Sequence, residues 1–191
     1  MSEKIITVSR NDFDNMTHPS CIFNIPFTFT DREMAEHDES LIQVIPYVAL
    51  RNDGKVLSYQ RQAGDNRLIT KHSVGFGGHP NQEWDYTEGK SLWCVVKSAA
   101  VREIREELGI PITPAQLIYL GDITLDVTEV DRLHTGIVFE CWVNDLLANN
   151  IAAEEGITGL SWIDVLDPDE YSRSEYENWS QYYVEEYYGT M

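Results

Sequence analysis

Three glutamates lie within five positions near the middle of the chain: Glu103, Glu106 and Glu107, in the segment V-R-E-I-R-E-E-L-G-I at residues 101 to 110. On a helix with about 100° per residue their side chains share an arc of about 100° and converge. The acidic run also ends at the expected C-terminus of the helix, where the macrodipole disfavours negative charge. A divalent cation such as Mg²⁺ or Mn²⁺ would relieve both the repulsion between the converging carboxylates and the unfavourable interaction with the macrodipole, because carboxylate oxygens are its preferred ligands.

The residues around these glutamates are compatible with a binding site and with an exposed helix face. Arg102 precedes Glu103 and lies four positions before Glu106, so it could orient a carboxylate. A separate apolar stripe faces the core and consists of Trp93, Val101, Ile104 and Leu108. The alternative is a solvated surface on which the Arg102–Glu106 pair contributes well under ~1 kcal/mol.

A helix from about 92 to 108 must carry these side chains. Ser91 is a suitable N-cap, Gly109 ends the helix, and Pro111 prevents its continuation. A second helix is predicted near residues 174 to 187. Its aromatic stripe, at helical spacing, favours packing against a sheet and consists of Tyr176, Trp179, Tyr183 and Tyr187.

The segments between the helices favour strands. The β-prone runs L-I-Q-V-I-P-Y-V-A-L and K-V-L-S-Y-Q-R are joined by R-N-D-G, which is typical of a hairpin turn. The segment S-V-G-F-G-G-H-P at 73–80 predicts a short strand that enters a glycine turn. Further strands are predicted within residues 115–127, 132–143 and 156–165. Residues 1–40 are mixed and predict a partly strand-forming arm.

The segment R-E-I-R-E-E-L-G-I at 102–110 resembles the second half of the Nudix box. That box reads glycine, five residues, glutamate, seven residues, then R-E-hydrophobic-x-E-E-x-G-hydrophobic. Every specified position of the second half is met, by Arg102, Glu103, Ile104, Glu106, Glu107, Gly109 and Ile110. The wider sequence also resembles a branch of predicted Nudix-type phosphoesterases with an extended G-G-H loop.

The first half of the box departs from this pattern. Its glutamate position is occupied by Cys94 and its glycine position by Glu88. The natural glycine pair is Gly77-Gly78, which places Gly78 24 residues before Arg102, where the box has 14. The segment 80–90 is therefore interpreted as an insertion. Candidates for the missing glutamate are Glu83 and Glu88.

The resemblance implies an α+β fold, the Nudix-type α/β/α sandwich with a mixed β-sheet between helices. Within a single domain overall, it predicts an N-terminal arm at 1–40 packed on a Nudix hydrolase domain at 41–191. It also implies a metal-dependent hydrolase that cleaves a diphosphate linkage in a nucleotide or nucleoside diphosphate derivative, by attack of water on phosphorus. The alternatives are a catalytically inactive Nudix-fold nucleotide-binding or regulatory protein and, more distantly, an acidic scaffolding protein.

The resemblance also assigns roles to residues. Mg²⁺ or Mn²⁺ would be bound by Glu103, Glu106, Glu107 and the backbone carbonyl of Gly77, while Arg102 holds Glu103; which carboxylate takes the water proton is open. Glu154 is the preferred further ligand, with Glu155, Asp126, Glu129 and Glu140 as alternatives. Substrate phosphates would be contacted by Arg61 and by Lys71 or Arg67, with an ordinary solvated base as the alternative for each. His79 would help to position a phosphate or a water molecule and His134 would contact the substrate, with a structural role as the alternative for both.

The chain is strongly acidic, with 32 Asp and Glu against 14 Lys and Arg and a formal net charge of −18. This negative charge disfavours binding to nucleic-acid polymers and anionic membranes. It would also repel a small phosphorylated substrate unless a cation lies between that substrate and the protein. No segment predicts a membrane span or a signal peptide, and three widely spaced cysteines favour a reduced, cytoplasmic compartment. A homodimer is compatible with the sequence, which does not define the oligomeric state.

Overall fold

A nine-stranded mixed sheet forms the centre of the molecule in the computed structural model, which describes residues 2–61 and 71–189. The strands are β1 (Lys4–Ser9), β2 (Phe27–Asp31), β3 (Leu41–Asn52), β4 (Lys55–Arg61), β5 (His72–Ser73), β6 (Gly75–Phe76), β7 (Ile118–Ile123), β8 (His134–Trp142) and β9 (Ile157–Ile163). The helices are α1 (Arg10–Asp14), α2 (Arg32–Ala35), α3 (Leu92–Leu108), α4 (Glu129–Leu133), α5 (Asp145–Ala148) and α6 (Asn178–Tyr188). The predicted α+β fold with a mixed sheet is confirmed.

Strand β3 organises the sheet because it pairs with four other strands. It runs parallel to β8, from Gln43 opposite His134 to Arg51 opposite Trp142. Its pairings with β1, β4 and β6 are antiparallel. At the outer positions β2 pairs with β1, β5 and β9 pair with β4, and β7 pairs with β8.

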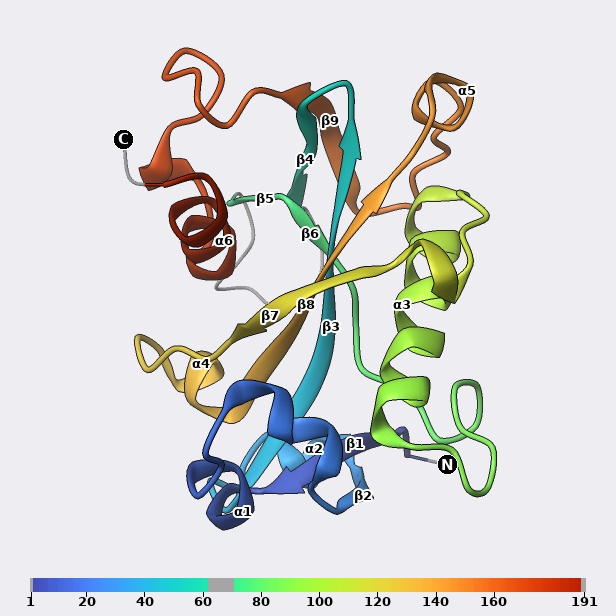
Figure 1. Ribbon diagram of the computed structural model, residues 1–191, viewed down its shortest axis with the longest axis vertical. Coiled ribbons are helices and arrows are strands. Elements are labelled where there is room, and N and C mark those ends of the chain that lie inside the picture. The colour runs from blue at the N-terminus through green and yellow to red at the C-terminus, as the bar shows by residue number, and fades with distance from the viewer. Residues whose placement is uncertain (1, 62–70, 190–191) are drawn as a thin grey trace.

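Two apolar cores lie on the two faces of this sheet, with α3 and α6 on opposite sides in Figure 1. The core beneath α3 contains Leu92, Val95, Val96, Ala100, Ile104 and Leu108 of the helix, packed with Val44, Val48 and Leu50 of β3. On the other face, Tyr183 and Val184 of α6 pack with Tyr47, Ala49 and Val138. The predicted core role of the aromatic stripe is confirmed, since Tyr176 and Tyr183 are almost fully buried.

The local signals for α3 and for the first hairpin are confirmed. The Ser91 hydroxyl accepts a hydrogen bond from the Cys94 N–H, and Gly109 ends the helix in the left-handed conformation, with φ of 68°. Between β3 and β4, Asp53 and Gly54 both have positive φ, as a two-residue hairpin turn requires.

Two predicted boundaries are wrong. The strand expected from residue 132 begins at His134, because Thr128 and Asp131 form a reciprocal capping box that starts α4. The C-terminal helix begins at Asn178 instead of near 174. Glu177 caps it by accepting hydrogen bonds from the backbone N–H groups of Trp179 and Ser180, while residues 173–175 form a separate 3₁₀ turn.

The N-terminal segment belongs to the same sheet, since β1 pairs with β3. On the same side of β1, beyond the end of this pairing, Ile5 forms an antiparallel bridge with Asn81. The Ile6 N–H donates to the Pro80 carbonyl at 3.2 Å, and the Gln82 N–H donates to the Lys4 carbonyl at 3.0 Å. The inserted loop 80–90 is therefore attached to the first strand.

Candidate active site

The glycine turn lies directly beside the acidic face of α3. A side chain at Gly77 would place its Cβ 1.9 Å from the Pro46 carbonyl oxygen, and φ of Gly77 is +154°. A Cβ at Gly78 would lie 2.6 Å from Glu103 Oε1. Both positions therefore require glycine: the first lets the turn pass close to β3, and the second leaves room for the Glu103 carboxylate.

Arg102 connects the acidic side chains of the site. Its Nη1 lies 2.7 Å from Glu103 Oε1 and 2.8 Å from Glu106 Oε2. Its Nη2 donates to the His79 carbonyl at 3.2 Å and lies 2.9 Å from Asp85 Oδ2. One guanidinium group thus joins the helix, the glycine turn and the inserted loop.

Asp85 is the site residue that the sequence did not reveal. Its carboxylate also accepts hydrogen bonds from Arg102 Nε, at 3.1 and 3.3 Å, and from the Asn81 N–H at 2.8 Å. Both glutamates considered for the missing box position, Glu83 and Glu88, are exposed, as is Cys94. The buried carboxylate facing Arg102 therefore comes from the inserted loop between these two glutamates.

Burial changes the pKa values of Glu103 and Arg102. It raises the pKa of Glu103 above its usual range, while the adjacent Arg102 opposes the rise. Burial alone would lower the pKa of Arg102, but the hydrogen bonds and charges of Asp85, Glu103 and Glu106 outweigh it and raise that pKa. Arg102 therefore stays charged and compensates the carboxylates around it.

The three helix glutamates have different environments. The Glu103 side chain is 15% exposed, whereas that of Glu106 is 54% exposed and that of Glu107 is half-buried. Within residues 2–61 and 71–189, no three His, Cys, Asp or Glu side chains are grouped as metal ligands. Instead, Glu103 and Glu106 meet on the guanidinium of Arg102.

Comparison with known proteins shows which family this chain belongs to. No protein-family model matches the chain. Protein YmaB of Bacillus subtilis (strain 168) is 35% identical over 158 residues, which cover 79% of this chain and 73% of YmaB. The chain belongs to the YmaB family.

Solved structures identify the fold of this YmaB-family protein. Tm1382, described as a candidate Nudix hydrolase, matches with a TM-score of 0.71 and 23% identity over 94% of both chains. A MutT NUDIX hydrolase from Burkholderia pseudomallei matches with a TM-score of 0.52 and 18% identity, over 76% of this chain and 97% of that one. The YmaB-family protein therefore has the Nudix fold. None of its described helices has the length and apolar character to cross a membrane.

Glu154 of the YmaB-family protein lies at the C-terminal end of α3. Its N–H donates to the Glu107 carbonyl at 2.9 Å, and the Ala152 N–H donates to the Leu108 carbonyl at 2.9 Å. The side chains of Glu154 and Glu155 are exposed. The backbones of Glu154 and Glu107 are therefore in contact, and ligation of a metal by the Glu154 side chain stays a prediction.

The other acids considered as ligands lie in different surroundings. Glu140 Oε1 accepts hydrogen bonds from Arg51 at 3.1 Å and from Tyr183 at 2.7 Å, in the core beneath α6. Asp126, in the segment before α4, and Glu129, the first residue of α4, are both exposed, and Asp126 pairs with Arg132. Glu154 therefore remains the preferred candidate.

His79 and His134 lie together, with ring centroids 5.6 Å apart. His79 Nε2 is 2.7 Å from Gln43 Oε1, and His134 Nδ1 is 2.7 Å from the Val130 carbonyl. Burial lowers the pKa of His79 to about 3, with Arg32 and His134 adding to the effect, and it also lowers the pKa of His134. Both rings therefore favour the neutral state, and a substrate contact by either stays a prediction.

Of the predicted cationic contacts, the structure describes the side chain of Lys71. Lys71 Nζ donates to the Ser174 carbonyl at 2.7 Å, close to the segment that precedes α6. The backbone of Arg61 ends β4, but its side chain lies outside the described part of the chain, as does all of Arg67. Their proposed phosphate contacts stay predictions.

Proposed function

We propose that the protein is a metal-dependent hydrolase that cleaves a diphosphate linkage in a nucleotide or nucleoside diphosphate derivative. The observation that carries this proposal is the set of contacts around Arg102, which gathers Glu103 and Glu106 beside the glycine turn. The sequence of this helix matches the second half of the Nudix box, and the fold is the one in which that box is found.

The donor set fits Mg²⁺ or Mn²⁺. Glu103, Glu106 and Glu107 would supply carboxylate oxygens, and Glu154 and the Gly77 carbonyl would add donors of the same hard type. Binding requires Glu106 to exchange its ion pair with Arg102 for the cation. This exchange costs little, because Glu106 is 54% exposed and exposed pairs contribute only about 0–1 kcal/mol.

The reaction needs a nucleophile brought to an anionic phosphorus centre. The bound cation would neutralise phosphate oxygens and acidify a water molecule. Water then attacks phosphorus, the bond to the bridging oxygen breaks, and the leaving group departs with that oxygen. A site carboxylate takes the water proton. Arg102, fixed by Asp85, keeps the Glu103 carboxylate in position, and Gly78 leaves the space that this carboxylate occupies.

A substrate panel tests the proposal. Nucleoside triphosphates, nucleoside diphosphate sugars and dinucleoside polyphosphates are incubated with Mg²⁺ or Mn²⁺ at mildly alkaline pH, and products are separated chromatographically. We expect turnover of at least one class, lost by more than about tenfold in Glu106→Gln. Glu33→Gln, the same change at an exposed position of α2, is the matched control and should keep full activity. Absence of turnover, or full activity of Glu106→Gln, would contradict the proposal.

The alternative is a Nudix-fold nucleotide-binding or regulatory protein without turnover. Cys94 at the box's glutamate position favours it, as does the lack of a preformed three-ligand group among the described residues. Binding of a nucleotide that the purified protein leaves intact for hours, with Mn²⁺ present, would support this alternative over the hydrolase.

A further inference from the structure

The inserted loop holds one large aromatic side chain in solvent. Trp84 is 70% exposed, whereas its neighbour Asp85 is 2% exposed and paired with Arg102. On the other side Tyr86 packs against Phe27 and Phe29 of β2, with ring centroids 6.2 and 5.0 Å apart. The indole therefore stands on a support that is fixed at both neighbouring residues. Such an arrangement lowers the entropy cost of contacting a ligand.

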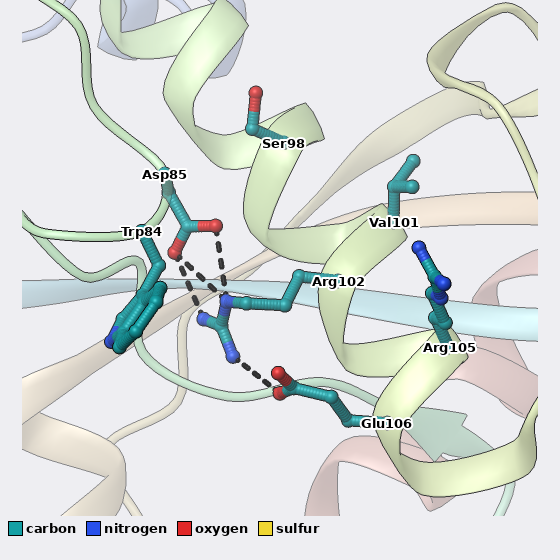
Figure 2. Close-up of a pocket in the computed structure, with 7 residues that line it drawn as sticks. All are labelled: Trp84, Asp85, Ser98, Val101, Arg102, Arg105 and Glu106. Atoms are coloured by element: carbon teal, nitrogen blue, oxygen red, sulfur yellow. Dashed lines mark hydrogen bonds and ion pairs between the residues drawn. The ribbon is translucent and has the colours of Figure 1, made fainter.

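Trp84 forms one wall of a surface pocket of about 510 Å³ that opens over the outer face of α3. Figure 2 shows Trp84 at one margin and Arg105 at the other, with the guanidinium of Arg102 and the carboxylate of Glu106 between them. Glu106 also belongs to the acidic face of the proposed site. The pocket therefore adjoins the place where the diphosphate would be cleaved.

The pocket contains a cation that is available to a ligand. Arg105 is exposed, and its guanidinium makes no hydrogen bond or ion pair with the residues that the structure describes. In contrast, Arg102 is compensated by three carboxylates. An indole at one margin of the pocket and an available guanidinium at the other suit a planar aromatic ring that carries an anionic group. Trp84 and Arg105 line the same pocket as Glu106, which belongs to the acidic face of α3.

We propose that this pocket is the nucleoside-binding subsite, in which the base stacks on Trp84 and Arg105 contacts a phosphate of the same ligand. The proposal rests on the proposed hydrolase function and names the part of the substrate that the inserted loop selects. Stacking of a base on an exposed aromatic side chain contributes about 1–3 kcal/mol, which corresponds to roughly 5- to 150-fold in affinity. Sugar phosphates without a base would lack this contribution.

The test measures binding instead of turnover. Calorimetric titrations with Mn²⁺ present compare α,β-methylene-ADP, which resists cleavage, with methylenediphosphonate, which has the same anionic group without a nucleoside. We expect Trp84→Ala to weaken binding of the nucleotide analogue about tenfold and to leave the diphosphonate within twofold. Trp84→Phe should retain most of the affinity, and Arg105→Gln should weaken both ligands. Matched controls are Trp142→Ala, at a half-exposed tryptophan of β8, and Arg173→Gln, which should change neither.

The outcomes separate this subsite from the hydrolase proposal. Equal binding of both ligands by the unmodified protein, or equal losses for both in Trp84→Ala, would overturn the subsite. If neither ligand binds, both the subsite and the hydrolase proposal are overturned. Binding of the nucleotide analogue that depends on Trp84, without turnover of any substrate in the panel, would support the subsite and contradict the hydrolase alone.

Discussion

Asp85 and Arg102 form a buried ion pair that attaches the inserted loop to α3. Arg102 donates through both Nε and Nη2, with Nη2 2.9 Å from Asp85 Oδ2, and the Asp85 side chain is only 1% exposed. In sequence the two residues are separated by the whole first half of the helix. The pair therefore depends on the fold, and it fixes the arginine that contacts Glu103 and Glu106.

Asp85→Asn should release this arginine. The amide keeps the shape of the carboxylate but loses its charge, so we expect the free energy of unfolding to fall by about 1–3 kcal/mol. We also expect kcat to fall about tenfold or more with a smaller change in KM, because Arg102 would position Glu103 less well. Chemical denaturation and steady-state kinetics measure both. Glu83→Gln, an exposed position of the same loop, is the control, and equal effects of the two changes would contradict this role.

Substitutions in the glycine pair should have different consequences. Gly78→Ala places a methyl group 2.6 Å from Glu103 Oε1, so the carboxylate must move, and we expect activity to fall more than tenfold with little loss of stability. Gly77→Ala meets the Pro46 carbonyl oxygen at 1.9 Å and has φ of +154°. It should mainly lower the melting temperature. Thermal melts and reaction rates of both variants test this contrast. Equal losses of activity and of melting temperature in the two variants would refute it.

Glu154→Gln should weaken Mn²⁺ binding. The backbone of Glu154 contacts that of Glu107 at the C-terminal end of α3, and if its carboxylate is a ligand, loss of that charge should raise the Kd roughly tenfold. Calorimetric titration with Mn²⁺ measures it. Glu33→Gln removes the same charge from an exposed position of α2, so it separates ligation from the general field of the protein. Equal weakening in both variants would show that only the field matters.

The pH dependence of stability should reflect the buried imidazoles. Burial lowers the pKa of His79 from 6.5 to about 3, so the folded protein keeps this ring neutral while the unfolded chain takes up a proton near pH 6.5. The stability contributed by the neutral ring is therefore present above about pH 6.5 and is lost as pH falls from there toward about 3. Denaturation of metal-free protein at pH 7.5 and 5.5 should show a smaller decline for His79→Gln. An unchanged decline would exclude this histidine as the cause.

Much of the fold could be predicted because its signals are local. The caps of α3, the hairpin turn at Asp53-Gly54 and the apolar periodicity of the helices depend only on neighbouring residues. The capping box at Thr128 and Asp131 is an equally local signal for α4, in the short segment between the strands predicted within residues 115–127 and 132–143. Local chemistry therefore predicts the elements, within errors of a few residues at their ends.

The site could be predicted only where it lies on one helix. The spacing of Glu103, Glu106 and Glu107 places them on α3 from sequence alone. Asp85 has no comparable signal, because its position depends on the bridge between Ile5 and Asn81 across the sheet. A short, irregular loop contains no periodicity that indicates which side chain is buried. The sequence therefore offers the exposed Glu83 and Glu88 as candidates for the box glutamate as readily as the buried Asp85 between them.

The bridge between Ile5 and Asn81 also covers a strand edge. One edge of β1 pairs with β2, and on the other edge β3 pairs only with Thr7–Ser9, so the inserted loop is the partner of the Lys4–Ile6 half. An open strand edge is prone to pairing with other chains. The loop therefore covers an edge that other chains could otherwise pair with, and the same loop carries the Asp85 carboxylate that pairs with Arg102.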